Sequence, residues 1–454
     1  MSMKKIKRKK HNKIKVRKGM RKVQIEKGTK NNLTINAGLI PIIQYMHKIG
    51  FTLMFGREVD HERGLNARYL LTDVVELTIL GLIAGVSTIC GIATIWADPV
   101  LRKIGGWLST PHETTLGRIY KTVTCKQVYE LQVLNHKLRI REWARLIKSG
   151  NKLKSASNEL WIDIDSTVKV VYGHQEGAEK GYNPENRGKR SYHPLLAFCG
   201  ETKEILQGWL RPGNTYTSNG TVEFLKELFG YVNNPIKTLV RGDSGFFDGD
   251  LFEYLEGRRK GYLIKVKLKG LKELLSKQEW KPVKGVIGFE ETSFSYKCEK
   301  WKKERSFVAV RKVKEKESKN QLDFFEKKDY EYFCYVLTEE YTPWEAHKKY
   351  GERATCETWI EEAKNQMGLG HIKTSDFWAN ALIFQSAIMA YNIVRWMALL
   401  SGDKKMISWE IKTIRMFLIR VAGMLIETGR QLKLLNPVKL LYENQWKRWC
   451  ELGV

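Results

Sequence analysis

Residues 350–364 read Tyr350-Gly-Glu-Arg-Ala-Thr-Cys-Glu-Thr-Trp-Ile-Glu-Glu-Ala-Lys364. On a helix, four polar side chains of this stretch fall within about 60° of one another: Tyr350, Arg353, Glu357 and Lys364. Four apolar side chains form a neighbouring face typical of a protein core: Trp359, Ile360, Ala363 and Met367. One carboxylate therefore lies between two cations. That arrangement suits a metal ligand flanked by phosphate-binding groups, provided that the chain supplies further carboxylates.

Two upstream segments supply aspartates at the ends of β-like runs. The run from Leu160 to Asp165, Leu-Trp-Ile-Asp-Ile-Asp, alternates apolar residues with Trp161, Asp163 and Asp165, as a strand requires. A second β-rich run stops at a turn cluster, Gly242-Asp-Ser-Gly245, which contains Asp243. Carboxylates from distant segments can converge on paired divalent ions, and without cations they would repel one another.

These residues, in this order, resemble the DDE transposases of bacterial insertion sequences, in the group marked by a Tyr-Arg-Glu-Lys signature. Further blocks resemble one subgroup of these enzymes: Gly-His-Gln-Glu-Gly-Ala-Glu-Lys-Gly-Tyr-Asn-Pro at 173–184, Ser-Tyr-His-Pro-Leu-Leu-Ala at 191–197 and Leu-Arg-Pro-Gly-Asn at 210–214. The resemblance covers at least residues 160–397. It implies that the catalytic metal ligands are Asp165, Asp243 and Glu357, and that the DNA phosphates are bound by Tyr350, Arg353 and Lys364.

The acidic set has competitors. Asp163 faces the same side of its strand as Asp165, but the Asp-Ser-Thr position of the family block favours Asp165. Glu361 lies one helical turn beyond Glu357, and Glu362 is adjacent to Glu361; the spacing of the family pattern favours Glu357.

The resemblance also implies a reaction and its partners. We expect a transposase that binds the terminal inverted repeats of its element, cleaves at the element ends and joins the 3′-hydroxyl ends to target DNA. Two Mg²⁺ ions, or Mn²⁺, would activate the nucleophile and stabilise the leaving oxygen. The expected partners are double-stranded DNA and a second copy of the chain in a synaptic homodimer, without a small-molecule cofactor. The alternatives are a nuclease of the same fold that joins no strands, and a non-catalytic DNA-binding protein derived from a transposase.

Composition agrees with a nucleic-acid partner. The 454 residues have a net charge of +28 and a pI near 9.6, which favours a polyanion, and 43% hydrophobic residues indicate a folded protein. Seven scattered cysteines without a CxxC pair predict reduced thiols and a cytoplasmic, nucleoid-associated protein. The uncharged stretch 77–97 is long enough to span a bilayer, but it divides at Gly85-Val-Ser-Thr and predicts two buried helices rather than a membrane span.

The predicted fold class is α/β, with several domains: a ribonuclease-H-like catalytic core interrupted by an all-β insertion and preceded by a helical DNA-binding domain. The predicted regions are a basic tail (1–32), the helical domain (33–155), the first part of the core (156–268), the insertion (269–341), the second part of the core (342–400) and a C-terminal helical region (401–454). Within the helical domain, a helix that begins at Pro111, capped by Ser109 or Thr110, resembles part of a helix-turn-helix.

Two minor groups of residues remain. His174 and His193 lie near Asp165 in sequence, but a lone loop histidine is usually structural and this chemistry requires none. Four aromatic side chains of the insertion are candidates for stacking on an unpaired base, although most are expected to be core: Trp301, Phe324, Phe325 and Tyr332.

Overall fold

The computed structural model describes residues 31–64, 67–107, 109–150, 159–181, 187–232, 237–313, 329–370, 374–429 and 431–453. The chain divides into Met1–Asn31 and a compact unit, Asn32–Val454, and the description below concerns the second. The predicted basic tail lies outside the described residues except for its last two positions. Phe324 and Phe325 also lie outside them.

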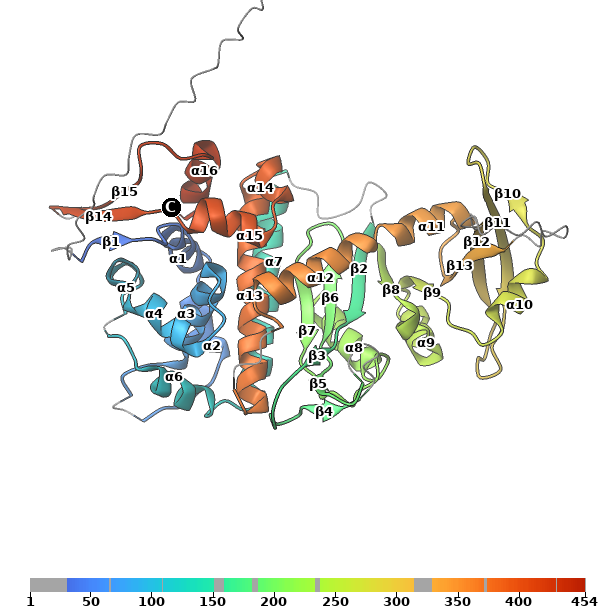
Figure 1. Ribbon diagram of the computed structural model, residues 1–454, viewed down its shortest axis with the longest axis horizontal. Helices are drawn as coiled ribbons and strands as arrows, with labels where there is room; N and C mark the ends of the chain where they lie inside the picture. The colour runs from blue at the N-terminus through green and yellow to red at the C-terminus, as the bar shows by residue number, and fades with distance from the viewer. Residues whose placement is uncertain are drawn as a thin grey trace, which may run out of the picture. The chain divides into compact units, whose positions relative to one another are not determined.

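A mixed nine-stranded sheet organises this unit (Figure 1). In spatial order its strands are β7 (Ile205–Trp209), β6 (Leu195–Cys199), β2 (Glu159–Ser166), β8 (Lys237–Gly242), β9 (Gly261–Lys265), β13 (Tyr330–Leu337), β12 (Arg305–Val313), β11 (Phe289–Tyr296) and β10 (Lys281–Pro282). The neighbours β2, β8 and β9 run parallel, and every other adjacent pair runs antiparallel. The prediction of an α/β fold is therefore confirmed, with a mixed sheet.

Alternation along β2 divides its side chains between two cores, as predicted. Leu160, Ile162 and Ile164 are buried in a cluster with residues of α8 (Thr221–Tyr231) and α9 (Gly249–Gly257). Trp161 is buried on the other side, with Leu239 of β8. Because side chains on a strand alternate in direction, Asp163 and Asp165 lie on the Trp161 side.

Helices cover that second side. The relevant elements are α11 (Pro343–Gly351), α12 (Ala354–Gln366) and α13 (Phe377–Leu400). The predicted core face of α12 is confirmed, because Trp359, Ile360, Ala363 and Met367 are all buried and belong to the same cluster as Phe198 of β6. Burial of these side chains fixes which face of α12 is left for the polar residues.

The N-terminal part of the unit is helical, as predicted. Its helices are α1 (Leu39–Lys48), α2 (Phe51–Glu58), α3 (Leu71–Ala84), α4 (Ile89–Ala97), α5 (Pro99–Gly105), α6 (Glu113–Tyr120) and α7 (Cys125–Lys148). Both α3 and α7 pack against α13. The predicted cap is wrong: α6 begins at Glu113, where the ring of His112 accepts from the Thr114 N–H at 3.3 Å, because Ser109 and Thr110 are bonded to Tyr69 and Arg102 instead.

The stretch 77–97 divides as predicted. Helix α3 ends at Ala84, Gly85 adopts a left-handed conformation (φ 91°), and α4 begins at Ile89 after a bend of 97°. By length and composition alone, α13 could cross a membrane, and so could α3 and α4 if they were taken as one bent span. In the apolar 18-residue stretch of α13, however, 94% of the stretch is buried inside the protein, which is typical of the core helix of a folded domain.

Two regions differ from the outline predicted from sequence. The strands of the predicted insertion are part of the main sheet, since β13 pairs with β9. The predicted C-terminal helical region is only partly helical: α14 (Lys404–Ser408), α15 (Ile411–Ile414), a π-helical turn (Arg415–Ile419) and α16 (Glu443–Gly453) surround a hairpin of β14 (Gly423–Thr428) and β15 (Gln431–Leu435). The two strands of the hairpin pair locally, and β14 also pairs with β1 (Leu33–Thr34), from the other end of the unit. The remaining elements are α10 (Leu271–Ser276) and a small sheet of β3 (Lys169–Val170), β5 (Arg190–Tyr192) and β4 (Glu179–Lys180).

Candidate active site

The parallel pairing of β2 with β8 brings the two predicted aspartates together. Asp163 of β2 lies opposite Arg241 of β8. The two predicted aspartates come two residues after these positions: Asp165 lies within β2, and Asp243 lies just past the end of β8. The adjacency of these two strands, which the family resemblance implied, is confirmed. Parallel strands end at the same edge of a sheet, so both carboxylates lie at that edge.

Backbone N–H groups hold both aspartates. An oxygen of Asp165 accepts from the Ser166 N–H at 2.8 Å, and an oxygen of Asp243 accepts from the Gly245 N–H at 2.8 Å. In the second contact Asp243 caps a short 3₁₀ helix, Ser244–Phe246, so the predicted turn at residues 242–245 begins with this cap.

The stretch 350–364 is not one uninterrupted helix. Helix α11 ends at Gly351 and α12 begins at Ala354, and the junction is tightened by bonds between residues three apart, Arg353 N–H to Tyr350 C=O (2.9 Å) and Cys356 N–H to Arg353 C=O (2.8 Å). The junction residues keep right-handed helical dihedrals, with φ −60° and −65° for Glu352 and Arg353. Tyr350, Arg353 and Glu357 therefore remain close together despite the break.

Arg353 lies between two of the predicted metal ligands. Its guanidinium is 3.4 Å from an oxygen of Asp165 and 3.5 Å from an oxygen of Glu357, and it also donates to the Ile164 carbonyl at 3.3 Å. The side chain of Arg353 is only 5% exposed, whereas that of Glu357 is 71% exposed. Arg353 was predicted to bind phosphate; in this structure its contacts are to carboxylates and a carbonyl.

The electrostatics show that the carboxylates are close. Burial raises the pKa of Asp165 to about 6; Arg353 opposes this rise, and the charges of Asp243 and Glu357 add to it. Burial likewise raises the pKa of Tyr350 to about 12, and the same three acids contribute. The ring of Tyr350 packs against that of Tyr335 of β13, with centroids 4.7 Å apart, which orients the phenol. The three acids and Tyr350 thus share one electrostatic environment.

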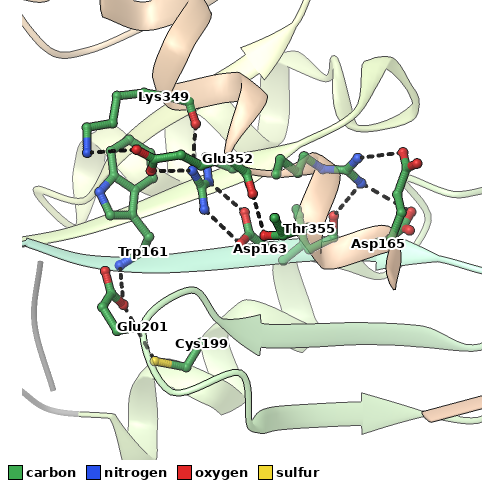
Figure 2. A network of polar contacts seen from close by, with 12 residues as sticks. Trp161, Asp163, Asp165, Cys199, Glu201, Lys349, Glu352 and Thr355 are labelled. Atoms are coloured by element: carbon green, nitrogen blue, oxygen red, sulfur yellow. Dashed lines mark hydrogen bonds and ion pairs between the residues drawn. The ribbon is translucent and has the colours of Figure 1, made fainter. Parts of the chain in front are cut away.

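Asp163 is committed to a buried ion pair with Arg241. The two side chains make a bidentate contact, with N···O distances of 2.6 and 2.9 Å, and each is 2% exposed or less (Figure 2). Arg241 also donates to the Lys349 carbonyl at 2.6 Å and stacks on the Trp161 ring, 4.7 Å from its centroid. The pair therefore ties β2 and β8 to the end of α11, and Arg241 engages both carboxylate oxygens of Asp163 in place of a metal ion.

The two glutamates that compete with Glu357 on α12 also differ in their burial and contacts. Glu362 is 6% exposed and accepts from the Ile411 N–H at 3.0 Å, so it anchors α15 to α12. Glu361 is exposed. Of the three, Glu357 is the one whose charge acts on Asp165.

Two lysines lie beside the aspartates. Lys364 donates to the Thr167 hydroxyl at 2.7 Å, two residues beyond Asp165. Lys169 of β3 lies at the end of α12, the helix that carries Lys364, since a Cβ added to Gly370 would be 3.6 Å from Lys169 Nζ and 3.2 Å from the Lys364 carbonyl. Burial and then the charge of Lys364 lower the pKa of Lys169. Two neighbouring lysines beside Asp165 suit a phosphate dianion or diester. Lys364 was predicted from the sequence and Lys169 was not, since its only sequence signal is a cation four residues after Asp165.

The donor chemistry of the site fits a hard divalent ion. Oxygen donors from Asp165, Asp243 and Glu357 are the ligands that Mg²⁺ and Mn²⁺ prefer. Burial, and to a lesser extent the charges of Asp243 and Glu357, raise the pKa of Asp165, and a bound cation would favour its charged form. Among the described residues, no three His, Cys, Asp or Glu side chains are placed so that they already form a metal-binding group. Arg353 occupies the position between the carboxylates, and the exposed Glu357 is the ligand that would have to turn away from it.

Comparison with protein families gives a match over almost the whole chain. The profile described as Transposase DDE domain group 1 matches residues 16–449. The chain belongs to this family of DDE transposases. The family acts in DNA transposition and implies phosphoryl-transfer chemistry that depends on a divalent metal.

No curated protein sequence matches this DDE transposase. Among solved structures, the cryo-EM structure of a piggyBac transposase synaptic complex with hairpin DNA is similar, with a TM-score of 0.44 and 13% sequence identity, covering 85% of this chain and 79% of that chain.

Proposed function

We propose that this transposase cleaves DNA at the ends of its insertion sequence and joins the resulting 3′-hydroxyl ends to target DNA. The observation that carries the proposal is the convergence of three segments distant in sequence. Asp165 and Asp243 end adjacent parallel strands, and Glu357 is linked to Asp165 through Arg353. The sheet order, three antiparallel strands (β7, β6, β2) followed by two parallel ones (β8, β9), supports a ribonuclease-H-like core.

In this proposal Asp165, Asp243 and Glu357 hold two divalent ions, Mg²⁺ or Mn²⁺. When bound, these ions supply Lewis-acid stabilisation of charge at the scissile phosphate. The Tyr-Arg-Glu-Lys signature then has two kinds of role. Lys364, with Lys169, binds a phosphate next to the scissile bond, and Tyr350 hydrogen-bonds to another. Arg353 orients the carboxylates, and the Asp163–Arg241 pair fixes the strands that carry the two aspartates.

The other regions receive DNA-related roles in the proposal. The helical domain 33–155 binds the terminal inverted repeats, and two copies of the chain hold two element ends as a homodimer. The connection between α5 and α6, residues 106–112, is longer than the 3–4-residue turn of a helix-turn-helix. It therefore gives no support to the predicted helix-turn-helix, and sequence-specific binding by this domain stays a prediction.

The decisive experiment uses DNA duplexes that carry the inverted repeats flanking the coding region, incubated with Mg²⁺ and a target plasmid. The parent protein is expected to nick the ends and form strand-transfer products. Asp165→Asn, Asp243→Asn and Glu357→Gln are expected to bind the same DNA without cleaving it, and Glu361→Gln serves as the matched control that keeps activity.

Each alternative has its own outcome. Nicked ends that never join the target would support the nuclease. No cleavage by the parent, with equal DNA binding by all variants, would support the non-catalytic DNA-binding protein. Loss of activity in Glu361→Gln but not in Glu357→Gln would move the third ligand to Glu361.

A further inference from the structure

A buried arginine holds residues 213–219, a loop within the connection between β7 and α8. Arg211 is 6% exposed, and its guanidinium donates to the carbonyls of His193 (2.9 Å), Asn219 (2.7 Å) and Thr217 (3.5 Å). The loop begins at Gly213, whose backbone meets the Ser191 carbonyl so closely that an added Cβ would come within 2.0 Å of it. Both ends of the loop are therefore fixed.

His193 adds a third attachment and connects the loop to the candidate active site. Its Nδ1 is 2.6 Å from the Thr215 carbonyl; because a carbonyl only accepts, Nδ1 carries the proton. The Nε2 atom is then the acceptor for the Ser166 hydroxyl at 3.1 Å. Burial lowers the pKa of His193, which keeps the ring neutral in this tautomer. His193 is thus structural, as predicted, but its position links Thr215 to the residue after Asp165.

Thr217 lies between the two aspartate segments. Its hydroxyl is 3.1 Å from the Ser166 hydroxyl, and its methyl group would be 2.9 Å from a Cβ added to Gly245. Ser166 and Gly245 are the residues whose N–H groups bond Asp165 and Asp243. The loop therefore touches the segment of each aspartate through one residue.

Tyr216 stands between these two anchored threonines, and its side chain is 66% exposed. Because Thr215 and Thr217 are both anchored, the backbone that carries this exposed ring is fixed beside the segments of the two aspartates. The nearby exposed loop residues, Asn214 and Asn219, are neutral, so the loop offers a ring face rather than a phosphate-binding cation. Positive charge comes from α12 instead, where Lys364 donates to the hydroxyl of Thr167, the residue after Ser166.

We propose that Tyr216 stacks on a nucleotide base at the DNA end that the site acts on. The inference rests on the proposed function and adds a base-contacting residue to it. Every base has a π-face, so an aromatic side chain can hold a terminal nucleotide whatever its sequence, while Lys169 and Lys364 hold its phosphate. Because the loop is already ordered, stacking on it adds little entropic cost.

The test measures base stacking directly, in the full-length protein with Ca²⁺ in place of Mg²⁺. 2-Aminopurine replaces, one at a time, each of the three nucleotides on either side of the cleavage position in element-end DNA. With the parent and with Tyr216→Phe, fluorescence of one position should be quenched on binding. With Tyr216→Ala the quenching should disappear, and DNA whose terminal nucleotide is unpaired should bind roughly 5- to 150-fold more weakly. Val438→Ala is the control, because Val438 is a large apolar side chain, 95% exposed, in a region without a proposed DNA contact, and it should behave like the parent.

The outcomes separate the two proposals. If the parent binds and cleaves element ends but Tyr216→Ala binds and quenches like the parent, the stacking proposal is overturned and the function stands. If the parent fails to bind element-end DNA, the proposed function itself fails. Melting temperatures of all variants are compared first, and an exposed tyrosine should leave them unchanged.

Discussion

At the scale of single residues, Arg353 has the most informative position. A nearly buried guanidinium lies between Asp165 and Glu357 and supplies positive charge among the carboxylates. Burial nevertheless keeps the pKa of Asp165 raised, and the charges of Asp243 and Glu357 add to the rise. A divalent cation bound beside Asp165 would favour its charged form.

Asp165 should make the stability of the protein depend on pH in mild acid. Its pKa is about 6 in the folded protein against an ordinary value of 3.8, so the folded state binds more protons between these values. The free energy of unfolding should therefore fall as the pH rises through this range, by at most roughly 3 kcal/mol, and level off above it. Asp165→Asn removes this contribution.

The measurement is chemical unfolding in EDTA at pH 5 and pH 8. Asp165→Asn should gain stability relative to the parent at pH 8, and the gain should be smaller at pH 5. An equal difference at both pH values would show that the carboxyl of Asp165 is not perturbed.

The Asp163–Arg241 pair should be costly to break from one side. Arg241→Met leaves a fully buried carboxylate without its partner and should reduce the free energy of unfolding by about 3–5 kcal/mol. Replacing both residues, Asp163→Leu with Arg241→Met, should cost less than the sum of the two single changes. Urea unfolding of the four proteins gives this coupling.

The matched control lies on the same strand. Lys237 of β8 pairs with Glu339, but its side chain is 52% exposed, so Lys237→Met should change stability by less than about 1 kcal/mol. Additive losses for Asp163 and Arg241 would contradict the ion pair.

At the scale of elements, close backbone contacts give the sharpest expectation. Gly213 faces the carbonyl oxygens of Ser191 and Glu179, which an added Cβ would approach to 2.0 and 2.4 Å. Gly213→Ala should therefore destabilise the protein by more than roughly 2 kcal/mol, since backbone has to move. Thermal unfolding measures the effect.

Gly230, in α8, is the control for this substitution. No atom lies within 4 Å of a Cβ added there, and alanine favours a helix over glycine by up to about 1 kcal/mol. Gly230→Ala should thus be neutral or slightly stabilising. If both variants behaved alike, the close approach at Gly213 would be contradicted.

The elements also show what local sequence can and cannot predict. Alternation along β2 and the apolar face of α12 were readable because each depends on neighbours within a few residues. The break at Glu352 and Arg353 was not, because the junction keeps helical dihedrals and its residues have no strong helix-breaking character. The β14–β15 hairpin was missed although its two strands are local, and its third strand, β1, lies at the opposite end of the unit, where a local pattern cannot show the pairing.

The same distinction holds for the candidate site. The resemblance to DDE transposases, carried by residue type and spacing, selected Asp165, Asp243 and Glu357 as a set, and their role as metal ligands stays a prediction. Residue type and spacing could not assign Asp163 to Arg241, because that pair depends on the register between two strands 78 residues apart. Nor could they bring Lys169 next to Lys364, since the two residues become neighbours only when β3 and α12 have folded.

At the scale of the whole molecule, charge sets the expected behaviour towards DNA. Residues 1–31 contain fourteen Lys and Arg and one Glu, and they form a unit separate from Asn32–Val454. Deleting these residues should weaken DNA binding and flatten its dependence on salt, by about 0.9 in the log–log slope for each phosphate that the tail neutralises.

Binding titrations between 50 and 200 mM salt measure that slope. The melting temperature should be unchanged, because the compact unit has its own cores. A slope equal to that of the full chain would mean that the basic tail binds no phosphates.

The continuous sheet has a consequence for how such a chain can change over time. The chain leaves the sheet's parallel part at Lys265 and returns on β13, where Tyr335 pairs with that same Lys265. Departure and return are thus neighbours, and the strands β10, β11 and β12 lie beyond them at one edge. The turns that join β10, β11 and β12 can lengthen or shorten without moving the strands that carry the aspartates, so this edge is where relatives can diverge most freely in length. Strand β12 itself is less free to change, because Phe307 and Ala309 are buried in the same cluster as Ile162 and Ile164 of β2.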